Sequence, residues 1–136
     1  MDIEKLRRQH GELLLAIGGL RELVQAGARE HATAIHDQLV AISSAIKLHL
    51  AVEDRVLYPA MEHAADSDVA RTSRQFREEM GGLAAAYAAF AGRWSLSTRI
   101  AQDPQGFRDD ANAVFKALHQ RIQRENKELY PLAERV

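Results

Sequence analysis

Residues 46–59, IKLHLAVEDRVLYP, contain the pattern that decides the fold of this chain. Steps of three and four residues connect mostly apolar side chains, as expected for the core-facing side of a helix. This seam consists of Ile35, Leu39, Ile42, Ile46, His49, Glu53, Val56 and Ala60. His49 and Glu53 interrupt it one turn apart and on the same face. Because burial of either group without a partner is costly, the seam predicts a bound ligand, with a metal ion as the first candidate.

Three other segments have the same helical periodicity. The first, over residues 3–24, has His10 as its one polar member, and the third, over residues 76–94, is apolar throughout and includes Met80. The last consists of Phe107, Ala111, Val114, Leu118, Arg121, Glu125, Glu128 and Leu132. Three of the four seams therefore bring ionisable groups into the predicted core.

Composition excludes several classes of protein. A chain of 136 residues is expected to form a single domain over residues 1–136. A net charge of −1 without a basic block argues against nucleic acid as a partner. No apolar run is long enough for a membrane span, and the N-terminus lacks the apolar region of a signal peptide. The absence of cysteine excludes disulfides and thiolate metal sites, and the expected compartment is the cytoplasm.

Turn and capping signals predict helices over residues 2–25, 30–63, 67–94 and 103–133. Ser67 is a candidate N-cap for the third. Asp103 and Pro104 fit the N-cap and first position of the fourth. Pro59 is expected to kink or end the second helix in its last turn. The predicted fold is all-α, an up-down-up-down antiparallel four-helix bundle, because short connections make neighbouring helices antiparallel.

The glycine pairs at residues 18–19 and 81–82 fall inside predicted helices, where glycine is unfavourable. Close packing and a local kink both remain open as explanations.

The polar seam residues are expected to meet in one layer of this bundle. Counted from the predicted loops at about 1.5 Å per residue, they lie within roughly two turns of a common level. The chain also contains an internal repeat: a shift of 72 residues places His49, Glu53 and the following LYP over Arg121, Glu125 and a second LYP. The two halves therefore each contribute to one asymmetric site.

The order QH, then HLAVE with LYP, then EMGGL, and finally E with LYP resembles the hemerythrin-like HHE cation-binding domains over essentially the whole chain. The resemblance implies a four-helix bundle whose site typically holds two non-heme irons bridged by two carboxylates, with roles in binding or sensing dioxygen or nitric oxide, or in handling iron. It implies that His10 and His49 are terminal ligands of one iron and that Glu53 and Glu125 are the bridging carboxylates.

The second iron of such a site takes histidines from the third and fourth helices, where this chain has Met80 and Arg121. The chain is therefore interpreted as a divergent member with an incomplete di-iron ligand set. We expect one iron, in a mononuclear or depleted site, with zinc as a possible substitute. Two imidazoles with carboxylates suit either metal.

Several neighbours have more than one interpretation. Arg121 either replaces the charge of a second metal or reaches solvent, and Glu125 either binds metal or pairs only with Arg121. Glu79 is a possible substitute ligand, an ion-pair partner or a surface residue, and Met80 fits core packing better than iron ligation.

The tyrosines Tyr58 and Tyr130 fit packing at the bundle end or hydrogen bonding to the site. His31, His36, His63 and His119 fall outside the seams and are expected at the surface.

The main functional hypothesis is a metal-binding protein that senses oxygen, nitric oxide or redox state, or handles iron, as a monomer or homodimer. The alternative is a degenerate, metal-free bundle that acts as a protein-interaction or signalling module. An enzyme is the weaker option, since no nucleophile–base pair or cofactor motif is visible.

Overall fold

The structure is a computed structural model that describes residues 2–136. Within these residues it contains helices and turns and no β-strand. The elements in chain order are α1 (Ile3–Gly27), α2 (Ala32–Val52), η1 (Glu53–Leu57), α3 (Tyr58–Glu62), α4 (Ser67–Met80), α5 (Leu83–Arg93), α6 (Ser97–Gln102), α7 (Pro104–Arg124), η2 (Glu125–Leu129) and α8 (Tyr130–Ala133).

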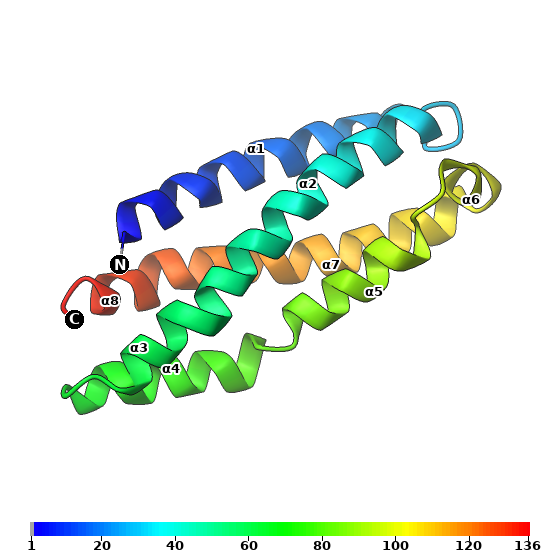
Figure 1. The fold of residues 1–136 in the computed structure, drawn as a ribbon. Coiled ribbons are helices and arrows are strands. Elements are labelled where there is room, and N and C mark those ends of the chain that lie inside the picture. The colour runs from blue at the N-terminus through cyan, green and yellow to red at the C-terminus, as the bar shows by residue number, and fades with distance from the viewer. Residues whose placement is uncertain (1) are drawn as a thin grey trace.

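These elements form a helical bundle (Figure 1). α1 packs along α2, α3 against α4, and α5 along α7. The turn between α1 and α2 lies at the same end as α6, whereas both termini and the α3–α4 turn lie at the other end. Among the described residues, no helix combines the length and apolarity that crossing a membrane requires.

The predicted helix starts are close to the observed ones. Asp103 caps α7 by accepting a hydrogen bond from the backbone of Gly106, and Pro104 is the first helical residue, as predicted. The predicted cap at Ser67 is wrong by one residue, because the side chain of Asp66 caps α4 instead. The Asp66 carboxylate accepts from the backbone N–H of Asp68.

The predicted third helix is broken after Met80. Gly81 and Gly82 form a turn between α4 and α5, which decides the open question at this pair in favour of a break. A Cβ atom on Gly81 would lie 2.4 Å from the backbone oxygen of Arg77, whereas Gly82 has open space. The other pair, Gly18 and Gly19, lies inside the continuous helix α1.

The second and fourth predicted helices each contain a π-helical turn, which the sequence did not predict. These turns, η1 and η2, begin at Glu53 and Glu125. Each turn of this kind holds one more residue than an α-helical turn and rotates the later side chains about the helix axis. The core-facing positions predicted for these two helices are therefore wrong beyond the glutamates. Val56 and Glu128 are exposed, and Ala60 and Leu132 are not in the buried core. The buried residues there are Leu57, Tyr58, Met61, Leu129, Tyr130 and Ala133.

The buried apolar side chains form two clusters on either side of the polar layer. The larger cluster fills the end with α5 and α6 and contains four aromatic pairs among Tyr87, Phe90, Phe107 and Phe115, beside Trp94. The smaller one lies among the ends of α1, α3, α4 and α8. Between them the chain buries ionisable groups that need partners.

Candidate metal centre

Four ionisable side chains converge between the two apolar clusters. His10 comes from α1, His49 from the last turn of α2, Glu53 from the start of η1 and Glu125 from the start of η2. All four are at most 3% exposed. One ligand atom from each lies within 4.8 Å of the others. The sequence thus correctly predicted that these residues lie together.

The atoms that face one another in this cluster are potential metal donors. His49 Nε2 lies 3.2 Å from Glu53 Oε1, and His10 Nε2 lies 3.2 Å from Glu125 Oε1. Within the described residues, His49 Nε2 and Glu125 Oε1 are buried without a hydrogen-bond partner. Buried polar atoms are normally paired, so these two need a cation or a proton between them and their neighbours.

Two amide side chains orient the imidazoles. His10 Nδ1 lies 2.8 Å from Asn126 Oδ1, and His49 Nδ1 lies 2.7 Å from Gln9 Oε1. Because an amide oxygen only accepts, each Nδ1 donates its hydrogen. In the neutral rings the lone pair is then on Nε2, directed at the carboxylates. Hydrogen bonds of this kind commonly fix the tautomer of metal-binding histidines.

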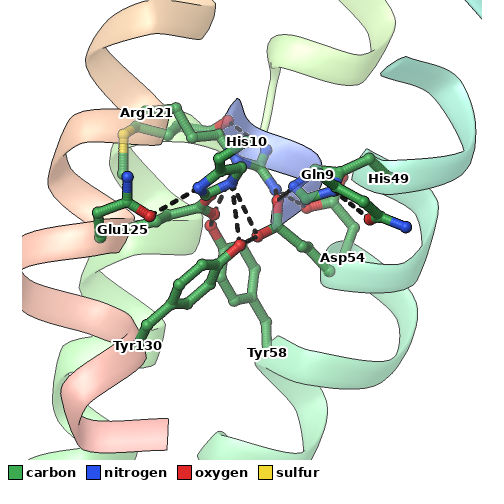
Figure 2. Close-up of polar contacts among 11 residues, drawn as sticks. Gln9, His10, His49, Asp54, Tyr58, Arg121, Glu125 and Tyr130 are labelled. Atoms are coloured by element: carbon green, nitrogen blue, oxygen red, sulfur yellow. Dashed lines mark hydrogen bonds and ion pairs between the residues drawn. The ribbon is translucent and has the colours of Figure 1, made fainter. Parts of the chain in front are cut away.

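Two buried tyrosines cross-link the halves of the site. Tyr58, the first residue after η1, donates to Glu125 Oε2 at 2.7 Å. Tyr130, which follows Glu125, donates to Glu53 Oε2 at 2.5 Å and also lies 2.9 Å from His10 Nε2. Figure 2 shows both phenol groups directed into the cluster. The π-helical turns place the two rings here, because each shifts the residues after its glutamate.

The guanidinium of Arg121 lies within the site and not in solvent. Its Nε donates to Glu125 Oε2 at 3.1 Å, and its Nη2 lies 3.3 Å from Glu53 Oε1 and 2.8 Å from Asp54 Oδ1. The side chain is 1% exposed, and its guanidinium carbon Cζ lies 5.2 Å from the ring centre of Tyr58. The structure therefore excludes the interpretation in which Arg121 reaches solvent.

The pKa shifts reflect burial and the surrounding charges. Burial and the neighbouring His10 lower the pKa of His49 to about 4. Burial also lowers the pKa of His10, but the hydrogen bonds to Glu125 and Asn126 and nearby carboxylate charge raise it overall. Burial, followed by the charge of Glu53, raises the pKa of Glu125. Burial lowers the pKa of Arg121, but the surrounding acids raise it overall and keep the guanidinium charged.

With ionised carboxylates and neutral imidazoles, the cluster has an excess of negative charge. Three carboxylates, Glu53, Asp54 and Glu125, face one guanidinium. When all are ionised and both imidazoles are neutral, the formal charge is that of two unpaired carboxylates. One divalent cation would compensate it.

Other sequence-predicted residues lie outside the ligand cluster. Glu79 is exposed and pairs with Arg124 on the surface, so it does not line the site. Met80 is half-buried and packs on the smaller apolar cluster, and its backbone oxygen accepts from Arg121 Nη1 at 3.3 Å. The remaining histidines also lie away from the site, half-buried or exposed: His31, His36, His63 and His119.

Sequence reasoning missed Gln9, Asn126 and Asp54 as members of the site. Each is directly next to a recognised residue: Gln9 precedes His10, Asn126 follows Glu125 and Asp54 follows Glu53. Adjacent helical residues point in different directions, so no seam contains them. The available signal was the QH pair and the acidic pair at Glu53 and Asp54.

The hemerythrin HHE cation binding domain model matches residues 1–133. The chain belongs to this family. Comparisons with curated proteins and with solved structures give no significant match. Membership of a cation-binding family agrees with the cluster of His10, His49, Glu53 and Glu125, which could hold a metal ion.

The residues present fit a metal ion on chemical grounds. The cluster combines two imidazole nitrogens with two carboxylates, a donor set suited to iron(II) or zinc. The unpartnered His49 Nε2 and Glu125 Oε1 point into it, and the amides of Gln9 and Asn126 fix the rings.

Proposed function

We propose that this hemerythrin-like domain binds one non-heme metal ion, iron in the cell, through His10, His49, Glu53 and Glu125. The proposal rests on two buried atoms that could bind a metal and have no hydrogen-bond partner, His49 Nε2 and Glu125 Oε1. A cation bound there would satisfy both atoms and balance the excess negative charge. The proposal includes the four-helix, up-down-up-down form of the bundle, which the chain reversals in Figure 1 support.

Iron held by His10, His49, Glu53 and Glu125 would supply redox chemistry and the capacity to bind a small molecule. The chain's own residues would set how that centre behaves. The tyrosines hold one oxygen of each glutamate, and the amides of Gln9 and Asn126 hold the imidazoles. Because the centre is buried, only small molecules would reach it. We therefore propose a role in sensing oxygen, nitric oxide or redox state, or in iron handling.

Metal analysis of protein purified without a histidine tag tests the proposal. We expect one iron or zinc ion per chain. His49→Ala should abolish binding, because a single imidazole would remain in the cluster. The matched control is His119→Ala, which removes an exposed histidine outside the cluster and should leave metal content unchanged. Full metal content in His49→Ala would remove His49 from the ligand set.

A metal-free interaction module is the alternative, and the contacts of Arg121 favour it. The guanidinium already pairs with both buried glutamates, and the pKa of His10 is raised, so a protonated ring could supply further positive charge. In that case the untagged protein contains no metal, and its melting temperature is the same with chelator or with added iron(II).

Gas sensing and iron handling predict different spectra for the iron-loaded protein. A visible spectrum that changes on anaerobic addition of nitric oxide, or on exposure to air, supports sensing. A spectrum that responds to neither, together with ready transfer of the iron to a chelator, supports handling.

A further inference from the structure

The hydrogen bonds of the Arg121 guanidinium all go to oxygen acceptors. Its nitrogens contact Glu53 Oε1, Asp54 Oδ1, Glu125 Oε2 and the backbone oxygen of Met80 at 2.8–3.3 Å. Three acceptors are carboxylates and the fourth is a carbonyl at the break between α4 and α5. With an exposure of 1%, the group has exchanged water for these oxygens.

The two buried glutamates each face an imidazole and the guanidinium of Arg121. Glu125 directs Oε1 toward His10 at 3.2 Å and Oε2 toward Arg121 at 3.1 Å. Glu53 Oε1 lies 3.2 Å from His49 Nε2 and 3.3 Å from Arg121 Nη2. One position is therefore bounded by imidazoles and the other is filled by the guanidinium, with the same carboxylates between them.

The internal repeat explains why a cation from the chain occupies the second position. Arg121 corresponds to His49 after the shift of 72 residues, and each lies one turn before its glutamate. One half of the chain thus presents a neutral nitrogen donor and the other a permanent positive charge.

We propose that Arg121 is an internal cation that occupies a second, all-oxygen cation position and so limits the native site to one exchangeable metal. This inference rests on the proposed function. Arg121 acts as a specificity-determining residue, because the oxygen atoms it neutralises would otherwise present three carboxylates and a carbonyl to a metal.

The chemical class of ion that fits the second position differs from that of the first. Carboxylate and carbonyl oxygens suit hard divalent cations such as Mn²⁺, Mg²⁺ and Ca²⁺. The imidazole-containing position suits iron(II) or zinc. Removal of the guanidinium should therefore create a site with different selectivity, without any new ligand from the protein.

Manganese titration of Arg121→Ala tests the inference. Metal-free protein receives one equivalent of Zn²⁺, and uptake of Mn²⁺ is followed by the loss of the free-ion electron paramagnetic resonance signal. We expect about one Mn²⁺ per chain in the variant and none in the native protein. Any residual affinity of the native protein for Mn²⁺ should be at least about tenfold weaker than that of the variant.

Two further variants control for charge and identify the ligands. Arg124→Ala removes a positive charge three residues later on α7, where the side chain pairs with Glu79 and Glu128 on the surface, and should take up no Mn²⁺. Adding Asp54→Ala to Arg121→Ala should weaken Mn²⁺ binding by about tenfold or more.

The outcomes separate this inference from the proposed function. If the native protein binds one Zn²⁺ and Arg121→Ala takes up no Mn²⁺, the inference is overturned and the proposed function stands. If the native protein binds neither Zn²⁺ nor iron(II), the proposed function fails, and the Mn²⁺ uptake of Arg121→Ala then decides the oxygen position by itself. If Arg121→Ala is unfolded without metal, recovery of its helical circular dichroism with Mn²⁺ supports the inference, and no recovery overturns it.

Discussion

Tyr130→Phe removes one hydroxyl from the buried centre and leaves the ring in place. That hydroxyl is the hydrogen-bond donor to Glu53 Oε2, at 2.5 Å, and both residues are 0% exposed. A hydrogen bond to a charged group contributes about 1.5–3 kcal/mol, and an unpaired buried acceptor adds to the loss. For a chain of this size, we expect the melting temperature of metal-free protein to fall by about 6–12 °C.

Tyr87→Phe is the matched control for this substitution. Tyr87 is 1% exposed, and its hydroxyl is 2.8 Å from the neutral hydroxyl of Ser43. Loss of a neutral hydrogen bond costs about 0.5–1.5 kcal/mol, or about 2–6 °C. Tyr58→Phe should fall between the two, because its acceptor, Glu125 Oε2, retains the donor Nε of Arg121.

Thermal unfolding of the three variants in chelator, followed by circular dichroism, measures the order. A loss of stability in Tyr130→Phe no larger than that in Tyr87→Phe would refute a stabilising hydrogen bond from Tyr130 to a charged Glu53. That result would mean that the hydroxyl of Tyr130 does not stabilise the Glu53 carboxylate in the folded protein.

Three other predictions concern the helix break, the surface and the amides that orient the imidazoles. Gly81→Ala should destabilise the protein by more than about 1 kcal/mol, because its Cβ would meet the Arg77 backbone. Its control, Gly82→Ala, should be neutral or stabilising by about 0.4–1 kcal/mol. Equal effects of the two substitutions in urea unfolding would contradict this. Arg93, followed by Trp94, lowers the pKa of Asp110 through hydrogen bonds. The stabilising contribution of Asp110 should therefore be complete above the unfolded pKa of about 3.9 and disappear as the pH falls through the lower folded pKa. Trp94 fluorescence should report this loss, and a stability difference from Asp110→Asn that is unchanged down to about pH 2 would argue against it. Asn126→Leu should weaken metal binding by about 10–100-fold, and competition with a chelator should detect the change; native affinity would exclude Asn126 from orienting His10.

The sequence alone was sufficient to predict the four buried ligand candidates and their meeting in one layer. Helical periodicity assigns His10, His49, Glu53 and Glu125 to inward faces, and loop-to-residue counts place them at similar heights. Both depend on local geometry, which α-helices repeat closely. The capping of α7 by Asp103 was predictable for the same reason.

Only the tertiary structure decided what surrounds that layer. The π-helical turns at Glu53 and Glu125 rotate the following residues, which buries Tyr58 and Tyr130 and exposes Val56 and Glu128. A seam drawn at 3.6 residues per turn cannot anticipate them, because the hydrogen bonds of the two tyrosines reach glutamates 67 and 77 residues away.

The direction of Arg121 is the other outcome that depended on the fold. A guanidinium on a seam can extend to solvent or remain inside, and the free energy of burial depends on how many acceptors surround it. Those acceptors come from three separate parts of the chain: Glu53 and Asp54 in η1, Met80 at the end of α4, and Glu125 in η2. Periodicity placed Arg121 on the inner face of its helix, but only the packed bundle brought these oxygens together around its charge.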